Sequence, residues 1–129
     1  DCANDPALST RFVEFCLTQN KQLTIIGLAG STLLEIAQAH GMAVYAEVFI
    51  DRRYMACGNL TPRHEPGACI EDIDQACAQA TQLAKYGQVT TIDQQLISLP
   101  VDTLCIHGDT ASALVLAQRV AKILAPFRP

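Results

Sequence analysis

The chain has 129 residues, half of them hydrophobic, and carries a formal net charge of −4. This size and composition predict one folded domain and exclude a disordered chain. Lys and Arg are scattered apart from Arg52 and Arg53, and no apolar run approaches the roughly 20 residues of a membrane-spanning helix, so we expect neither a nucleic-acid nor a membrane partner.

Helical and strand patterns alternate up to residue 49. Residues 4–6 place Asn and Asp before a Pro, which is typical of a helix start. The β-branched run at residues 23–26, closed by Gly27, predicts a buried strand. The elements expected in this part are a helix from residue 6, a strand at 23–26, a helix at 31–40 and a strand at 43–49.

The chain is irregular from residue 50 to residue 68, where Gly and Pro punctuate the sequence. A loop of this length inside a compact domain is more often functional than idle. Periodic patterns return beyond it. The elements expected there are a helix at 72–86, weak strands at 88–92 and 95–99, a strong strand at 103–106 and a helix at 110–124.

This alternation of helices and strands is the pattern of parallel βα units. The strong strands are nearly continuous apolar runs, as expected when helices cover both faces of a parallel sheet. The sequence therefore predicts an α/β fold in which residues 1–129 form one domain or a piece of one.

The six cysteines predict reduced, buried thiols rather than a disulfide framework. Cys16 and Cys77 fall within helical patterns, Cys105 falls within a strand pattern, and no pair has the Cys-x-x-Cys spacing of a zinc or redox site. Residues 1–6 have neither the basic start nor the apolar stretch of a signal peptide, so we expect a cytoplasmic protein. The chain also does not begin with Met, which is typical of a fragment or a processed product.

Polar residues follow three of the predicted strands, at residues 27–31, 47–54 and 107–109. Active sites of parallel α/β folds lie at the carboxyl ends of their strands. Parallel strands would bring the three groups to one rim, which is the main reason to expect a site there.

Each polar group also has a plain structural interpretation. Residues 27–31 form either an anion cradle or a tight turn with a Ser cap, and we favour the turn because the P-loop Lys and the third Gly of a dinucleotide fingerprint are absent. Residues 47–54 hold two carboxylates, two guanidinium groups and a phenol, which fit either a base with a substrate-orienting Arg or a surface ion-pair cluster.

The three histidines and Asp109 also have both functional and structural interpretations. His107 and Asp109 fit an acid and base pair or metal ligands, whereas Asp109 alone also fits a cap of the last helix. His40 fits the carboxyl end of a helix, and His64 fits a solvated loop side chain.

At these same segments the sequence resembles the LamB/YcsF family. The resemblance covers nearly the whole chain, in family order and at family-like spacing. Its most specific elements are E-V-F-x-D-R-x-Y at 47–54, L-x-P-R at 60–63 and H-G-D at 107–109. Further matches are residues 5–8, 26–31, 58–63, 66–68 and 102–109.

The resemblance implies the C-terminal half of a deformed seven-stranded, TIM-like (β/α) barrel of the glycoside hydrolase/deacetylase superfamily. It implies component A of a bacterial 5-oxoprolinase, which uses ATP and the B and C components to hydrolyse the lactam 5-oxoproline to glutamate. The implied catalytic residues are Glu47, His107 and Asp109. The implied substrate-binding residues are Asp51, Arg52, Tyr54 and Arg63, where Glu47, Asp51 and Arg52 organise substrate or a metal and Arg63 meets an anionic group.

The chain departs from the family in length. Family members are about twice as long, and the motifs N-x-D-x-G-E, C-G-F-H-x-G-D and K-P-H-G-x-L-Y-N of their N-terminal half are missing here. We therefore expect a partial catalytic set and no activity of this chain alone. Open strand edges predict association with the missing half or with a second copy as a homodimer.

Two other interpretations compete with the enzymatic one. The first is a non-catalytic half-barrel scaffold or interaction module that self-associates. The second is a flavodoxin-like sensor or nucleotide-binding domain, which rests only on the alternation of strands and helices and leaves residues 50–68 without a role.

Overall fold

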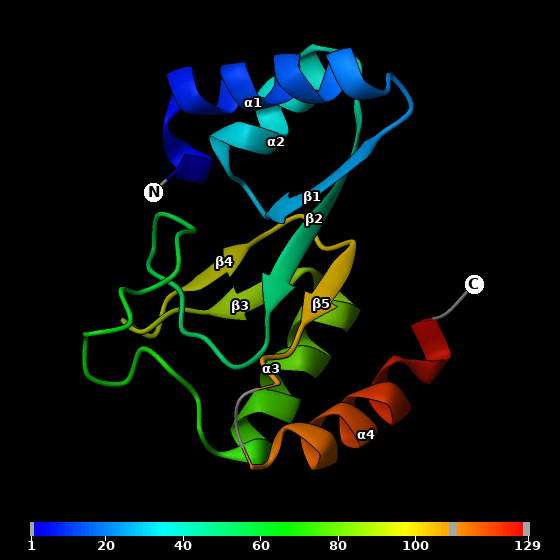
Figure 1. Cartoon of the computed structure of the whole chain (residues 1–129). Helices are drawn as coiled ribbons and strands as arrows, with labels where there is room; N and C mark the ends of the chain where they lie inside the picture. Colours follow the sequence, from blue (N-terminus) through cyan, green and yellow to red (C-terminus); the bar gives the residue numbers. More distant parts are fainter. Residues whose placement is uncertain (1, 109–110, 128–129) are drawn as a thin grey trace. The chain divides into compact units, whose positions relative to one another are not determined.

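The computed structural model describes residues 2–108 and 111–127, and the chain divides into two compact units, Asp1–Glu47 and Val48–Pro129. The described residues form an α/β fold with four α-helices, parallel strands and one antiparallel strand pair (Figure 1). The elements in chain order are η1 (Cys2–Asn4), α1 (Pro6–Gln19), β1 (Thr24–Leu28), α2 (Thr32–Ala39), β2 (Ala43–Phe49), α3 (Ile73–Tyr86), β3 (Gln88–Thr90), β4 (Leu96–Ser98), β5 (Thr103–Cys105), α4 (Ala113–Leu124) and η2 (Ala125–Phe127).

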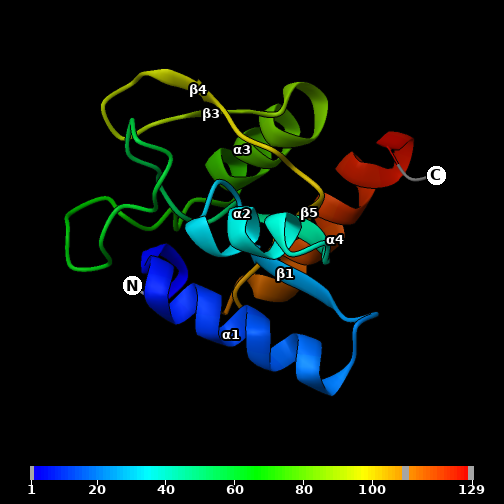
Figure 2. The same cartoon turned by 90° about the horizontal axis from the view of Figure 1, so that it is seen from above.

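The first unit begins with the predicted helix start. The Asp5 carboxylate accepts a hydrogen bond from the Leu8 N–H at 3.0 Å and Pro6 occupies the first turn, so the cap and the proline together start α1. Helices α1 and α2 lie side by side in both views (Figure 1, Figure 2). Their buried side chains include Val13, Leu34 and Ala37, which form part of the core of this unit.

Strands β1 and β2 pair in parallel, as predicted, with Thr24 opposite Ala43 and Leu28 opposite Glu47. β1 does not end at Gly27, however, but continues through it to Leu28. A Cβ built on Gly27 would lie 3.0 Å from the Leu34 Cδ2 atom. Gly27 therefore allows α2 to pack closely on the strand, and it is a packing residue rather than a strand terminator.

In the second unit, β5 lies beside the end of β2, where the Ile50 N–H donates to the Cys105 carbonyl at 3.4 Å. Helix α3 begins at its Asp72 cap, whose carboxylate accepts from the Gln75 N–H, and ends at the left-handed Gly87. The sequence predicted both ends of this helix.

Helix α3 packs against α4 in the second unit. Its buried residues include Ala76, Ala80 and Leu83, which belong to the predicted apolar face. An ion pair of 2.7 Å between Asp74 and Arg119 links the two helices, and this carboxylate raises the pKa of Arg119. Both side chains are well exposed, so the pair adds little to stability.

The weak strands β3 and β4 form an antiparallel hairpin instead of joining a parallel sheet, with Val89 opposite Ile97. The connection from Thr90 to Leu96 is far shorter than the dozen or more residues that a parallel crossover needs. Within the turn, the Thr91 N–H donates to the Gln95 carbonyl and Gln94 adopts a φ of 61°.

The cysteines are less buried than the sequence predicted. The five described cysteines are free thiols, but of these only Cys77 is buried, and Cys57 and Cys69 are exposed, contrary to the expected burial.

The longest described helices, α1 and α3, have 14 residues each, and none of the described helices is long and apolar enough to cross a membrane.

Candidate functional site

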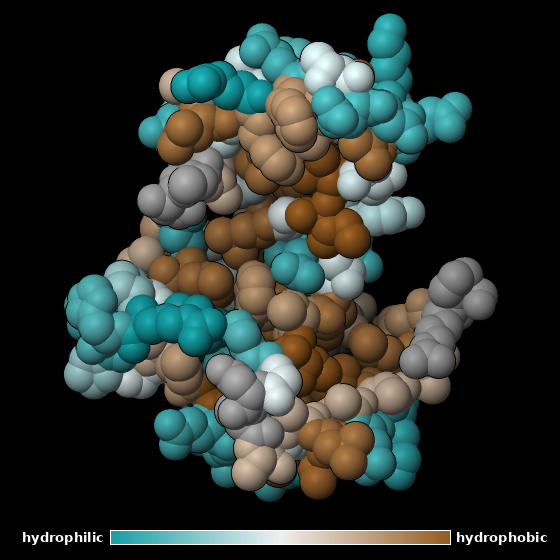
Figure 3. All heavy atoms as spheres, in the orientation of Figure 1, coloured by the Kyte–Doolittle hydropathy of each residue, from teal (hydrophilic) through white to brown (hydrophobic). Residues whose placement is uncertain are grey.

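The site of the second unit is built around the β2–α3 loop, residues 50–72. Isolated bridges join Arg52 to Cys69 and Tyr54 to Leu60, so the loop folds back on itself without regular strands. Figure 3 shows hydrophilic side chains over this loop. The loop therefore has a defined backbone that can hold side chains in place.

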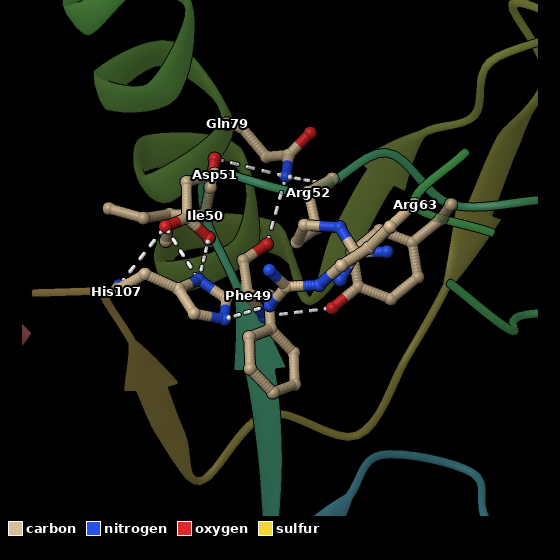
Figure 4. Close-up of polar contacts among 8 residues, drawn as sticks. Phe49, Ile50, Asp51, Arg52, Arg63, Gln79 and His107 are labelled. Carbon is tan, nitrogen blue, oxygen red and sulfur yellow. Dashed lines mark hydrogen bonds and ion pairs between the residues drawn. The ribbon is translucent and has the colours of Figure 1, made fainter. Parts of the chain in front are cut away.

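Asp51, just past the end of β2, binds His107, which follows β5. Its Oδ2 atom accepts from the His107 backbone N–H at 3.0 Å, and the His107 Nδ1 atom lies 2.9 Å from Oδ1 and 2.8 Å from Oδ2 (Figure 4). Both side chains are largely buried, at 14% exposed for Asp51 and 25% for His107. A carboxylate accepts and cannot donate, so the hydrogen on the ring is assigned to Nδ1.

Arg63 completes a row of three groups. Its Nη2 atom lies 2.9 Å from the His107 Nε2 atom. A guanidinium only donates, so this contact assigns Nε2 as the acceptor and the ring hydrogen to Nδ1. Phe49 stacks on the same ring with a centroid distance of 5.6 Å and an interplanar angle of 25°. Carboxylate, imidazole and guanidinium thus lie in series, with the basic nitrogen of the imidazole facing the guanidinium.

A cavity of about 390 Å³ lies beside this row. This volume is in the range of small-molecule sites, about 300–1,000 Å³. Its lining combines charged or polar groups with an apolar part, and includes Asp51, Arg52, Arg63, Cys69, Glu71 and His107 together with Ile70, Ile73, Ala76 and Leu116. The cavity can therefore hold a small, partly polar molecule against an anion-binding guanidinium and a general base.

Two of the predicted site residues, Tyr54 and Arg52, bind backbone groups of the protein itself. Tyr54 is fully buried, and its hydroxyl oxygen accepts from the Phe49 N–H at 2.8 Å. Arg52 lines the cavity but is 7% exposed, and its Nη2 atom donates to the Thr61 carbonyl at 2.6 Å. In this structure Tyr54 therefore holds the end of β2, and Arg52 holds the β2–α3 loop at Thr61.

Glu47 and Asp109 were predicted as catalytic residues. Glu47 belongs to the first unit, where it pairs with Leu28 and its side chain is half-buried. Asp109 lies outside the described residues. The cap of the last helix is Ser112.

The remaining polar positions have local partners. The Ala29 and Ser31 N–H groups donate to the carbonyls of Glu47 and Leu28, so these two donors are used by the turn that we favoured over an anion cradle. His40 caps α2, with Nδ1 2.8 Å from the Ile36 carbonyl. His64 is 81% exposed. Within residues 2–108 and 111–127, no three His, Cys, Asp or Glu side chains gather as a metal-ligating cluster.

Sequence reasoning missed Gln79, whose amide holds the backbone on both sides of Asp51. A signal was present, because Gln79 is a long polar residue within the apolar face of α3, between Ala76 and Ala80. Such residues are seldom buried without a specific partner.

Comparisons with known proteins agree with these segments. The LamB/YcsF family model matches residues 1–127. The chain is 45% identical over 118 residues to the A subunit of 5-oxoprolinase from Bordetella pertussis, covering 92% of this chain and 47% of that protein. It is 42% identical over 123 residues to the A subunit of 5-oxoprolinase from Methylococcus capsulatus, covering 95% of this chain and 47% of that protein. The chain spans about half the length of the curated relatives it matches.

A solved structure is also similar. The crystal structure of a lactam utilization protein from Thermus thermophilus matches with a TM-score of 0.86 and 28% sequence identity. The match covers 98% of this chain and 50% of that chain. The likeness in structure and sequence supports a related α/β fold.

Proposed function

We propose, from the premise that this chain belongs to the LamB/YcsF family, that it forms part of the A subunit of a 5-oxoprolinase. Its relatives carry that name, and the similar crystal structure is that of a lactam utilization protein. The proposed reaction is the ATP-dependent hydrolysis of 5-oxoproline to glutamate, carried out together with B and C components. Such a reaction would place the protein in the cytoplasm, where ATP is available.

The observation that carries this proposal is the row Asp51, His107 and Arg63 beside the 390 Å³ cavity. 5-Oxoproline is a small lactam with one carboxylate. A guanidinium binds a carboxylate through two parallel hydrogen bonds, which gives Arg63 the role of substrate anchor. The His107 Nε2 lone pair is then the base nearest to the bound ring.

On this proposal, phosphorylation of the amide oxygen by ATP turns this oxygen into a leaving group. Water attacks the activated carbon, and His107 Nε2 takes the proton of that water. Asp51 holds the imidazole in the tautomer that leaves Nε2 free to accept, and its negative charge stabilises the imidazolium that forms. The ring carbon–nitrogen bond of the tetrahedral intermediate then breaks, and the His107 imidazolium returns its proton to the leaving nitrogen. The resulting acyl phosphate reacts with a second water, which releases phosphate and leaves glutamate.

On the basis of the family resemblance, we keep Glu47 and Asp109 as proposed catalytic residues. On the same basis, Arg52 and Tyr54 are proposed to belong to the substrate site. The contacts described above support a positioning role for Arg52 and Tyr54. We also propose that further groups come from polypeptide equivalent to the rest of the relatives' length, so that this chain supplies one part of the site.

The fold proposed for the complete protein is the deformed seven-stranded barrel, of which this chain would form the C-terminal half. The parallel pair β1–β2 supports this, as does an apolar pair on its surface. Ile26 and Tyr45 are register partners, yet they are 59% and 53% exposed. We propose that further barrel strands or a second copy cover this face, because exposed apolar side chains of this size favour association.

The same exposed pair favours the alternative function, a non-catalytic half-barrel that self-associates. An assay separates the two functions. The chain is combined with B and C components, ATP and 5-oxoproline, with and without a polypeptide that corresponds to the other half of its relatives. ATP-dependent glutamate release supports the enzyme, and its absence in every combination supports the scaffold.

A pair of variants then tests the base. We expect His107→Ala to abolish turnover and His64→Ala to preserve it, because His64 is a solvated side chain of the β2–α3 loop. Equal turnover of the two variants would exclude His107 as the base.

A further inference from the structure

Asp51, which orients His107 in the proposed site, lies on backbone just beyond the end of its strand. β2 ends at Phe49, and residues 50–52 follow without the regular hydrogen-bond pattern of a β-sheet. Buried carbonyl groups in such a stretch need partners, since an unpaired one costs free energy. The position of Asp51 therefore depends on what binds these carbonyls.

One side chain binds three of them. Gln79 reaches from α3 toward the end of β2, and its Nε2 atom lies 2.9 Å from the Phe49 carbonyl oxygen, 3.2 Å from that of Ile50 and 2.8 Å from that of Arg52 (Figure 4). Gln79 is only 6% exposed. The amide thus holds the peptide groups before and after Asp51.

Three other backbone groups of this stretch are also bound. The Asp51 carbonyl accepts from the Ile70 N–H at 2.8 Å, and the Ile50 N–H donates to the Cys105 carbonyl. The Phe49 N–H donates to the Tyr54 hydroxyl. These bonds hold the backbone that carries Asp51, whose side chain in turn binds the backbone N–H and the ring of His107.

We propose that Gln79 is a positioning residue, which fixes the backbone around Asp51 and thereby holds His107 in the tautomer whose Nε2 atom carries no hydrogen. This role rests on the proposed function for its effect on turnover, but not for its effect on the imidazole. Gln79 itself acts through Asp51 and is assigned no contact with substrate.

The hydrogen bonds from Gln79 to the three carbonyl groups require a glutamine side chain. Two hydrogens on Nε2 serve three acceptors, so at least one hydrogen is shared between two carbonyls. A Glu at this position would direct a carboxylate oxygen at carbonyl oxygens. Met has a similar length but no donor, and Asn is one methylene shorter and cannot span the same distance.

The test compares Gln79→Met with Gln82→Met. Gln82 lies one turn later on α3 and is half-buried, and its amide binds Thr90, outside the cavity lining. The direct readout is the pair of imidazole ¹⁵N shifts of His107, assigned with His107→Ala. We expect the shifts in Gln79→Met to move toward a mixture of tautomers, and those in Gln82→Met to match the parent chain.

Turnover gives an independent readout. We expect kcat of Gln79→Met to fall by about 100-fold, as a displacement of about 1 Å from catalytic geometry produces, with a small change in KM. If Gln79→Met does not fold, Gln79→Asn is measured in the same way. Parent-like His107 shifts in a folded Gln79 variant would overturn the inference, whether or not the parent chain has oxoprolinase activity.

Discussion

Replacing Asp51 with Asn examines the centre of the site with the least change in shape. The Asp51 carboxylate receives two donors from one residue, the backbone N–H and the ring N–H of His107. An amide of the same size offers a single acceptor oxygen, and its other end donates. Both donors reach the same oxygen, Oδ2, which an amide oxygen can replace, but the substitution removes the negative charge and places a donor at the position of Oδ1. Both hydrogen bonds are therefore weakened, and the carboxylate no longer fixes the tautomer of the imidazole.

The expected cost in stability follows from these contacts. Asp51 is 14% exposed, so water replaces the weakened interactions poorly. A hydrogen bond to a charged group contributes about 1.5–3 kcal/mol and a neutral one about 0.5–1.5 kcal/mol, so weakening two bonds should lower the free energy of unfolding by about 1–3 kcal/mol. If the ring instead moves its hydrogen to Nε2, that hydrogen faces the Arg63 guanidinium, also a donor, and no basic lone pair remains. Turnover should then fall by about 10⁴-fold, as in other carboxylate–imidazole pairs.

Urea unfolding followed by circular dichroism measures the stability change, and glutamate release in the complete ATP-dependent system measures turnover. Asp93→Asn is the matched control, because Asp93 is exposed in the turn between β3 and β4. The same unfolding free energy and the same kcat for the two variants would refute the assignment of Asp51 as the orienting carboxylate.

Two further substitutions examine packing and substrate binding. Gly27→Ala should lower the free energy of unfolding by about 1–3 kcal/mol, because its Cβ would lie 3.0 Å from a Leu34 methyl carbon. Gly108→Ala, with open space around the added carbon, serves as the control in the same urea titration, and equal losses would contradict the close approach of α2. Arg63→Met should raise KM for 5-oxoproline by about 10- to 100-fold through the loss of a charged hydrogen-bonding partner. The exposed Arg11→Met is its control, and an unchanged KM for the Arg63 variant would exclude it as the substrate anchor.

Local signals predicted much of the fold. The apolar periodicity of residues 72–86 predicted helix α3, whose ends at the Asp72 cap and at Gly87 depend only on their immediate neighbours. The prediction for Gly27 was wrong because a missing side chain can end a strand or admit a neighbouring helix, and sequence alone does not separate the two. The pairing of β3 with β4 likewise depended on the length of the turn and not on the residues of the strands.

The site was predictable where topology brings residues together. Asp51 and His107 are 56 positions apart, and their meeting follows from β5 lying beside β2. Tyr54 and Gln79 show the limit of this reasoning. The alternation of faces no longer holds once the chain leaves β2, so the full burial of Tyr54 could not be inferred. The partners of Gln79 are backbone carbonyls, which every residue carries and no sequence pattern marks.

The contact between Arg63 and His107 affects the order of events in the proposed reaction. The Nε2 lone pair of His107 accepts one donor at a time, and that donor is the Arg63 guanidinium. In the proposed reaction the substrate carboxylate competes for the same guanidinium and draws it off the imidazole. Binding of the anion and exposure of the base would then be a single step.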